Sequence, residues 1–136
     1  MVKSSNKTIK LKYRNKIYAY VNHSEIFNDK YNFITNKNDP LQLGFFEMNS
    51  QDTSKYHYHN DYQRISKKTS EFIYVLSGKI EISFYSIKKK LLNKSILFKG
   101  GSALIFDLGH EIKYLKKTKL IEVKTGPFNQ NDKSHS

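Results

Sequence analysis

Cysteine is absent from this chain of 136 residues, which excludes disulfide bonds, thiolate zinc sites and cysteine nucleophiles. No apolar run approaches the length of a membrane span, and no apolar signal core follows the first, polar residues. The sequence also lacks a glycine-rich phosphate loop, a Gly-x-Ser-x-Gly elbow and the aromatic signature of an RNA-binding sheet. We therefore expect a soluble, cytoplasmic protein that does not associate with membranes.

Acidic residues and arginine are also scarce. The chain has 12 Asp and Glu against 24 Lys and Arg, a net charge of +12, and its arginines are Arg14 and Arg64 alone. This balance is compatible with an anionic partner such as nucleic acid, a membrane surface or a phosphorylated small molecule. However, the lysines are spread along the chain, and arginine is the residue favoured for bidentate contacts with phosphates and bases. The pattern favours a lysine-rich, solubilising surface and argues against nucleic-acid binding.

Short runs of alternating apolar residues, separated by turn signals, predict an all-β protein. At this length we expect one domain over residues 1–136, with a core at about 41–124 and flexible ends at 1–8 and 127–136. Between Asn22 and Pro40 we expect a long loop with a short helix. The expected strands are Ile9–Tyr13, Lys16–Val21, Leu41–Met48, Glu71–Leu76, Lys79–Ile87, Leu91–Phe98, Ser102–Phe106, Glu111–Leu115 and Leu120–Lys124, with a strand end at Tyr56–His59.

The pattern His57-Tyr58-His59 is the strongest chemical signal in the chain. On a strand, side chains alternate between faces, so both imidazoles would point the same way. The same alternation places Glu71 on one face with Ile73 and Val75, where a carboxylate must be paired, protonated or metal-bound. With a third histidine at position 110, these side chains offer nitrogen and oxygen donors suited to a divalent transition metal.

The order of these residues resembles the two sequence motifs of the cupin superfamily. The first motif corresponds to His57, His59 and Glu71 followed by Gly78, and the second to Gly101 followed by the Asp107–His110 segment. The interval between His59 and Glu71 is longer than the family pattern, and His110 follows Gly109 directly. The resemblance covers roughly residues 41–124 and implies a double-stranded β-helix, or jelly-roll, barrel.

The chain is also similar to a narrower group of cupins found among bacterial polysaccharide-biosynthesis genes. The features in common are the Tyr56–His59 segment, Arg64, Ser70-Glu71, Gly109-His110 and the ending Ile121–Phe128 with Asp132-Lys133. This likeness implies a sugar or nucleotide sugar as the bound small molecule. The cupin resemblance implies that His57, His59, Glu71 and His110 hold Fe, Mn, Ni or Zn.

Three functions remain open at this stage. The first is a metal-binding cupin acting on or binding a small anionic ligand, as an isomerase, an epimerase or a metal-dependent oxidoreductase. The second is a metal-independent isomerase or epimerase of nucleotide sugars that uses His57 and His59 as acid and base. The third is a non-catalytic sugar-binding or interaction module.

The residues expected to contact a ligand lie near the motif. Arg64 can clamp a phosphate or carboxylate, or form a surface ion pair. Gln63 shares its loop, and Tyr74 can stack on a ligand ring or pack in the core. We also expect a homodimer formed by pairing of exposed edge strands.

Overall fold

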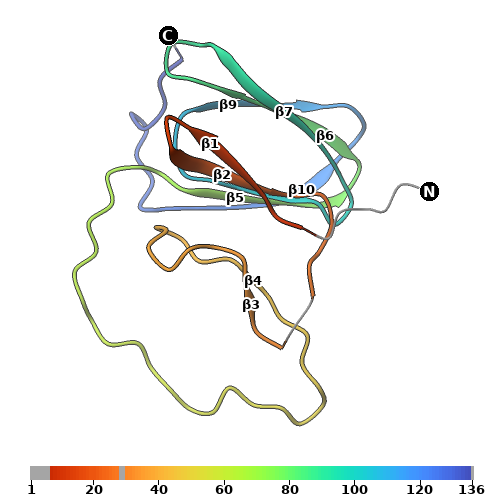
Figure 1. Cartoon of the computed structure of the whole chain (residues 1–136), viewed down its shortest axis with the longest axis vertical. Helices are drawn as coiled ribbons and strands as arrows, with labels where there is room; N and C mark the ends of the chain where they lie inside the picture. Colours follow the sequence, from red (N-terminus) through yellow and green to blue (C-terminus); the bar gives the residue numbers. More distant parts are fainter. Residues whose placement is uncertain (1–6, 28–29, 136) are drawn as a thin grey trace.

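A computed structural model describes residues 7–27 and 30–135 as an all-β protein of antiparallel strands (Figure 1). The described residues form no helix, so none of them belongs to a helix able to cross a membrane. The strands are β1 (Ile9–Tyr13), β2 (Lys16–Asn22), β3 (Asn32–Phe33), β4 (Gly44–Phe45), β5 (Glu71–Ser77), β6 (Lys79–Tyr85), β7 (Leu91–Phe98), β8 (Ser102–Ile105), β9 (Gly109–Tyr114) and β10 (Lys119–Lys124).

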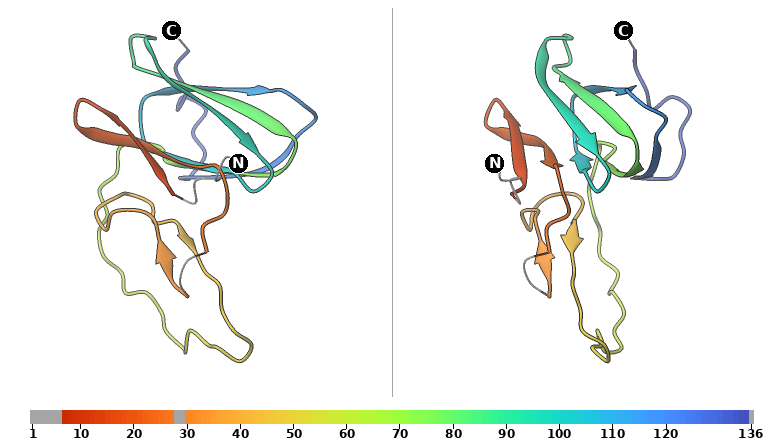
Figure 2. Two further views of the ribbon diagram at one scale, coloured as in Figure 1. Left: turned by 45° about the vertical axis from the view of Figure 1, so that its right-hand side comes forward. Right: turned by 90° about the vertical axis from the view of Figure 1, so that its right-hand side faces the viewer.

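Two sheets pack face to face (Figure 2). One has the strand order β1-β2-β8-β5-β10, and the other has the order β7-β6-β9. The chain crosses from one sheet to the other between β5 and β6, at Gly78, whose φ of +99° is a conformation that glycine adopts readily. A Cβ at this position would lie 2.5 Å from the carbonyl oxygen of Lys117, so the two neighbouring turns touch here.

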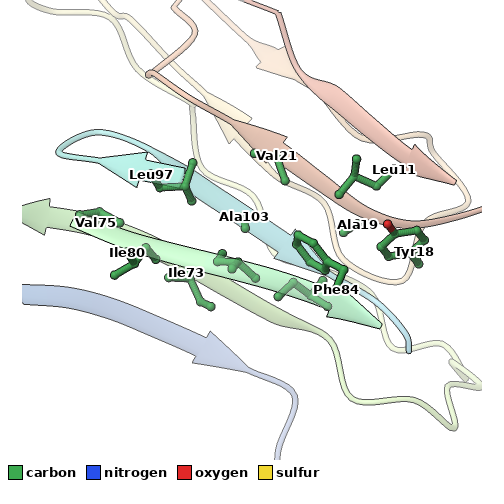
Figure 3. Close-up of a cluster of buried hydrophobic side chains, with 12 residues drawn as sticks. Leu11, Tyr18, Ala19, Val21, Ile73, Val75, Ile80, Phe84, Leu97 and Ala103 are labelled. Carbon is green, nitrogen blue, oxygen red and sulfur yellow. The ribbon is translucent and has the colours of Figure 1, made fainter. Parts of the chain in front are cut away.

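The core fills the space between these sheets (Figure 3). Period-two alternation explains it: Ile73 and Val75 of β5 and Ile80, Ile82 of β6 have no exposed surface. Burial of a side chain of this size contributes about 1.5–3 kcal/mol. The predicted inner face of β5 is therefore confirmed.

A second cluster covers the outer face of the five-stranded sheet. Tyr20, Leu104 and Phe106 are buried there against apolar side chains of the segment that includes β3 and β4. Partners from that segment are Ile34, Leu41 and Leu43. The segment thus forms a small third layer. Apolar packing holds it on a sheet face that would otherwise be exposed to solvent.

The structure differs from several of the detailed expectations. The sheets form no closed barrel within the described residues. The expected strand Leu41–Met48 is reduced to the two residues of β4, and the segment Asn22–Pro40, where described, contains no helix. The expected strand end at Tyr56–His59 is irregular. The predicted flexible ends lie partly outside the described residues.

One long connection leaves the sandwich. Residues 46–68, here called the arm, contain no strand, and every one of them is exposed. Figures 1 and 2 show the arm as a wide excursion between β4 and β5. Alternating apolar residues form a strand only where a neighbouring strand supplies hydrogen bonds, and Tyr56–His59 has no such neighbour among the described residues.

Candidate functional site

Glu71 and His110 are brought together from different sheets. Glu71 begins β5, in register with Ile105 of β8, and shares the inner face with Ile73. His110 lies on β9 opposite Phe84 of β6. Because β5 and β9 belong to facing sheets, side chains on their inner faces point toward one another across the sandwich.

The Oε2 atom of Glu71 lies 2.8 Å from Nε2 of His110, with side-chain exposures of 12% for Glu71 and 28% for His110. This oxygen is buried and has no aligned hydrogen-bond donor among the described residues, so the contact is a close polar approach. The imidazole is the largest influence on the pKa of Glu71 and lowers it, while burial opposes it. Lys124 and Lys133 lower the pKa further.

A carboxylate in contact with an imidazole can fix the tautomer and the orientation of the ring. The arrangement also permits proton transfer to or from a bound molecule, because one member is partly open to solvent. The same pair also suits a structural role, as an ion pair that satisfies a carboxylate on an apolar face.

His57 and His59 lie apart from this pair, in the exposed arm. Their ring centroids are 5.4 Å apart, and Nδ1 of His57 lies 3.0 Å from the carbonyl oxygen of Lys55. Within residues 7–27 and 30–135, no three side chains of His, Cys, Asp or Glu are placed to share a metal ion. The structure thus brings together two of the four expected ligands, Glu71 and His110.

The three expected ligand-binding residues do not converge either. Arg64 stacks over the ring of Tyr62 at 3.8 Å from its centroid, and Gln63 is exposed in the same arm. Tyr74 lies on the outer face of β5, where its hydroxyl donates a hydrogen bond of 2.7 Å to Glu25. That bond raises the pKa of Tyr74.

Sequence reasoning missed a basic hollow at one end of the sandwich. Its lining includes Arg14 and Lys16 of the first hairpin and Lys88 and Lys90 of the turn after β6. Lys88–Lys90 lie in the turn that connects β6 to β7. The missing signal was the proximity of the two hairpins, which local sequence patterns do not contain.

No protein-family model, curated protein or solved structure matches this chain. The all-β class with antiparallel sheets stands on the strand pairing itself. The cupin resemblance stands on the motif residues alone.

Proposed function

We propose that this chain is a cupin-type β-sandwich that binds a small molecule and transfers protons through Glu71 and His110. The single observation that carries the proposal is the 2.8 Å approach of Glu71 Oε2 to His110 Nε2 on the inner face of the sandwich. The cupin assignment gains support because residues from the two separate motifs meet there. Acid–base work moves from the histidine pair, where the sequence suggested it, to this pair.

The proposed reaction class is isomerisation or epimerisation, in which a proton leaves one carbon and returns to the same or an adjacent carbon. A carboxylate and an imidazole in contact suit such a step, because one group can accept a proton while the other donates one. The substrate class is a sugar or nucleotide sugar, a choice that comes from the resemblance to polysaccharide-associated cupins. A non-catalytic sugar-binding module is the alternative if no exchange occurs.

A divalent metal is the second proposal, and the residues do not fit it as arranged. Glu71 and His110 supply two donors, whereas His57 and His59 lie in the arm. The pairing of the two arm histidines, with ring centroids 5.4 Å apart, is the observation that keeps this proposal worth testing. Metal stoichiometry by mass spectrometry, for wild type and His57→Ala, tests it; no bound Fe, Mn, Ni or Zn after supplementation would remove it.

Homodimer formation is proposed through the sheet edges. β1 and β10 are the outer strands of the five-stranded sheet, and Ile121 and Val123 of β10 are exposed. Exposed edges of this kind are usually paired or covered. Light scattering after size exclusion tests the proposal, and a monomer at micromolar concentration would contradict it.

Proton exchange in deuterated water tests the catalytic proposal. The protein is incubated with a panel of nucleotide sugars, and deuterium incorporation at sugar carbons is measured by NMR. We expect exchange with at least one sugar, a loss on the order of 100-fold in Glu71→Gln and His110→Gln, and no change in Glu111→Gln. Glu111 is a matched control because it is exposed beside His110 on β9.

Two results would contradict the proposal. One is the absence of exchange with every sugar in the panel. The other is exchange that survives in both variants, which would leave the pair a structural role only.

A further inference from the structure

A hollow of about 700 Å³ opens at the end of the sandwich where five chain segments meet. These are the β1–β2 hairpin, residues 39–40 between β3 and β4, residues 66–68 at the base of the arm, the turn after β6 and the segment after β8. Its volume falls within the range of roughly 300–1,000 Å³ typical of small-molecule sites. Neither Glu71 nor His110 lines it, so it is a separate feature from the proton-transfer pair.

Apolar side chains contribute much of the lining. Ile17, Tyr18, Phe106 and Leu108 all contribute, and Tyr18 and Phe106 are only 4% and 6% exposed. Such side chains are held in place by the core behind them. An apolar or planar molecular body can therefore displace water from this surface favourably.

The polar lining is strongly basic. Two carboxylates, Asp39 and Asp107, face six cationic side chains: Arg14, Lys16, Lys67, Lys68, Lys88 and Lys90. Of these six, only Lys68 has an ion-pair partner within the described part of the chain, at 3.3 Å from Asp107. Five cations thus border the hollow without a neutralising carboxylate.

Both carboxylates are already engaged by the protein. Asp39 accepts hydrogen bonds from the hydroxyl of Tyr20 and, at 2.8 Å, from the backbone N–H of Asn36. Asp107 accepts one of 2.7 Å from the backbone N–H of Leu108. These bonds hold the carboxylates in place, and the excess positive charge remains for a ligand.

Three of the cations, Arg14, Lys88 and Lys90, lie in turns with defined geometry. In the turn after β6, Ser86 N–H donates to the Lys90 carbonyl at 2.8 Å, and Lys90 N–H donates to Ser86 Oγ at 3.1 Å. Arg14 and Leu108 both have positive φ, of 52° and 69°, which costs energy for residues with a Cβ. Conformations of this kind concentrate at ligand sites.

We propose that this hollow binds an organic phosphate whose body is apolar or planar. A phosphate dianion matches several unpaired cations better than a carboxylate monoanion does, and Arg14 offers a planar fork for two of its oxygens. The apolar lining takes the rest of the molecule. This site is separate from the proton-transfer pair, and its proposal does not depend on whether that pair is catalytic.

Calorimetric titration with 1-naphthyl phosphate tests the site directly. Inorganic phosphate and 1-naphthoate are the matched probes, because one lacks the apolar body and the other carries a single charge. We expect 1-naphthyl phosphate to bind at least tenfold more tightly than either. Equal affinity of inorganic phosphate, equal affinity of 1-naphthoate, or no binding of 1-naphthyl phosphate would overturn the proposal.

Charge variants locate the binding. Lys88→Gln combined with Lys90→Gln should weaken 1-naphthyl phosphate at least tenfold, and Arg14→Gln should weaken it several-fold. The control is Lys116→Gln with Lys117→Gln, an equal loss of charge outside the hollow, which should change affinity less than twofold. Equal weakening by both pairs would show general attraction to a basic surface and overturn the site.

A substitution of an apolar lining residue tests how much the apolar body of the ligand contributes to binding. Ile87 lines the hollow and is 69% exposed, so Ile87→Asn should fold normally and weaken 1-naphthyl phosphate several-fold. Ile65→Asn, in the arm and 84% exposed, is its control and should have no effect. Binding of a random single-stranded oligonucleotide is measured beside it. If the oligonucleotide binds more tightly than 1-naphthyl phosphate, and its affinity is unchanged in Ile87→Asn, the basic surface is a nucleic-acid site and the proposal is overturned.

Discussion

In the sandwich, side chains such as Ile73, Ile82 and Phe84 have no exposed surface, whereas in the arm Tyr56 is 90% and Tyr58 72% exposed. Both regions contain large apolar or aromatic residues at alternating positions, such as Tyr56 and Tyr58 in the arm. The difference lies in partners: β5 and β6 each have strands on both sides, while the arm has none among the described residues. Alternation therefore states which residues are able to share a face, and pairing decides whether that face is buried.

Truncation of a core side chain should give the largest difference in stability between the sandwich and the arm. Ile82→Ala should lower the free energy of unfolding by about 2–5 kcal/mol, because a cavity forms between the sheets. Tyr58→Ala should change it by less than about 0.5 kcal/mol, since its ring is exposed. Urea unfolding measures both values, and similar losses would show that the arm packs as part of the core.

A substitution where the third layer meets the sheet should have an intermediate effect on the free energy of unfolding. Tyr20 is fully buried there and donates a hydrogen bond to Asp39. Tyr20→Phe should cost about 1 kcal/mol because the Asp39 contact is lost. Burial is the main cause that raises the pKa of Tyr20 from 10.0 to about 12. Stability linked to this group is therefore complete below pH 10 and is lost as pH rises toward 12.

Alkaline unfolding curves of wild type and Tyr20→Phe test that linkage. The variant should lose less stability between pH 10 and 12 than the wild type does. Tyr114 is 58% exposed, so Tyr114→Phe is the control and should follow the wild-type curve. Identical slopes in all three proteins would contradict the buried position of the Tyr20 hydroxyl.

The Glu71–His110 pair should give an effect of similar size that depends on acid pH. Contact with His110 lowers the pKa of Glu71 from the ordinary 4.5. The stability that the Glu71 carboxylate contributes is therefore complete above pH 4.5. It is lost as pH falls through the lowered folded value. Glu71→Gln should cost about 1 kcal/mol at neutral pH and flatten the acid limb of stability against pH. An unchanged acid limb would show that the pair does not form in solution.

The arm histidines should give the smallest effect. His57→Ala and His59→Ala should each change the free energy of unfolding by less than about 0.5 kcal/mol, because both side chains lie in an exposed segment. Thermal unfolding, with and without added Zn²⁺, measures this. Zn²⁺ stabilisation that disappears in either variant would show that the arm folds back to form a metal site.

Local pattern was sufficient for the strands of the sandwich and insufficient for the arm. Ile9–Tyr13 and Leu91–Phe98 match the predicted bounds because turn residues flank a clear alternation. The meeting of Glu71 with His110 followed from two motifs on strands that face each other. The placement of His57 and His59 did not follow, because strand pairing depends on distant residues that no local window contains.

The position of β2 has a consequence for how the chain can be divided. β2 lies between β1 and β8, and its pairs run from Ala19–Ile105 to Asn22–Ser102, where the Asn22 amide also donates to Ser102 Oγ at 3.1 Å. The segments before and after the arm therefore lie side by side in one sheet, joined by the pairing of β2 with β8. A protease cut within the arm should yield two fragments that remain assembled, and co-expression of the two pieces should reconstitute the sandwich from separate polypeptides.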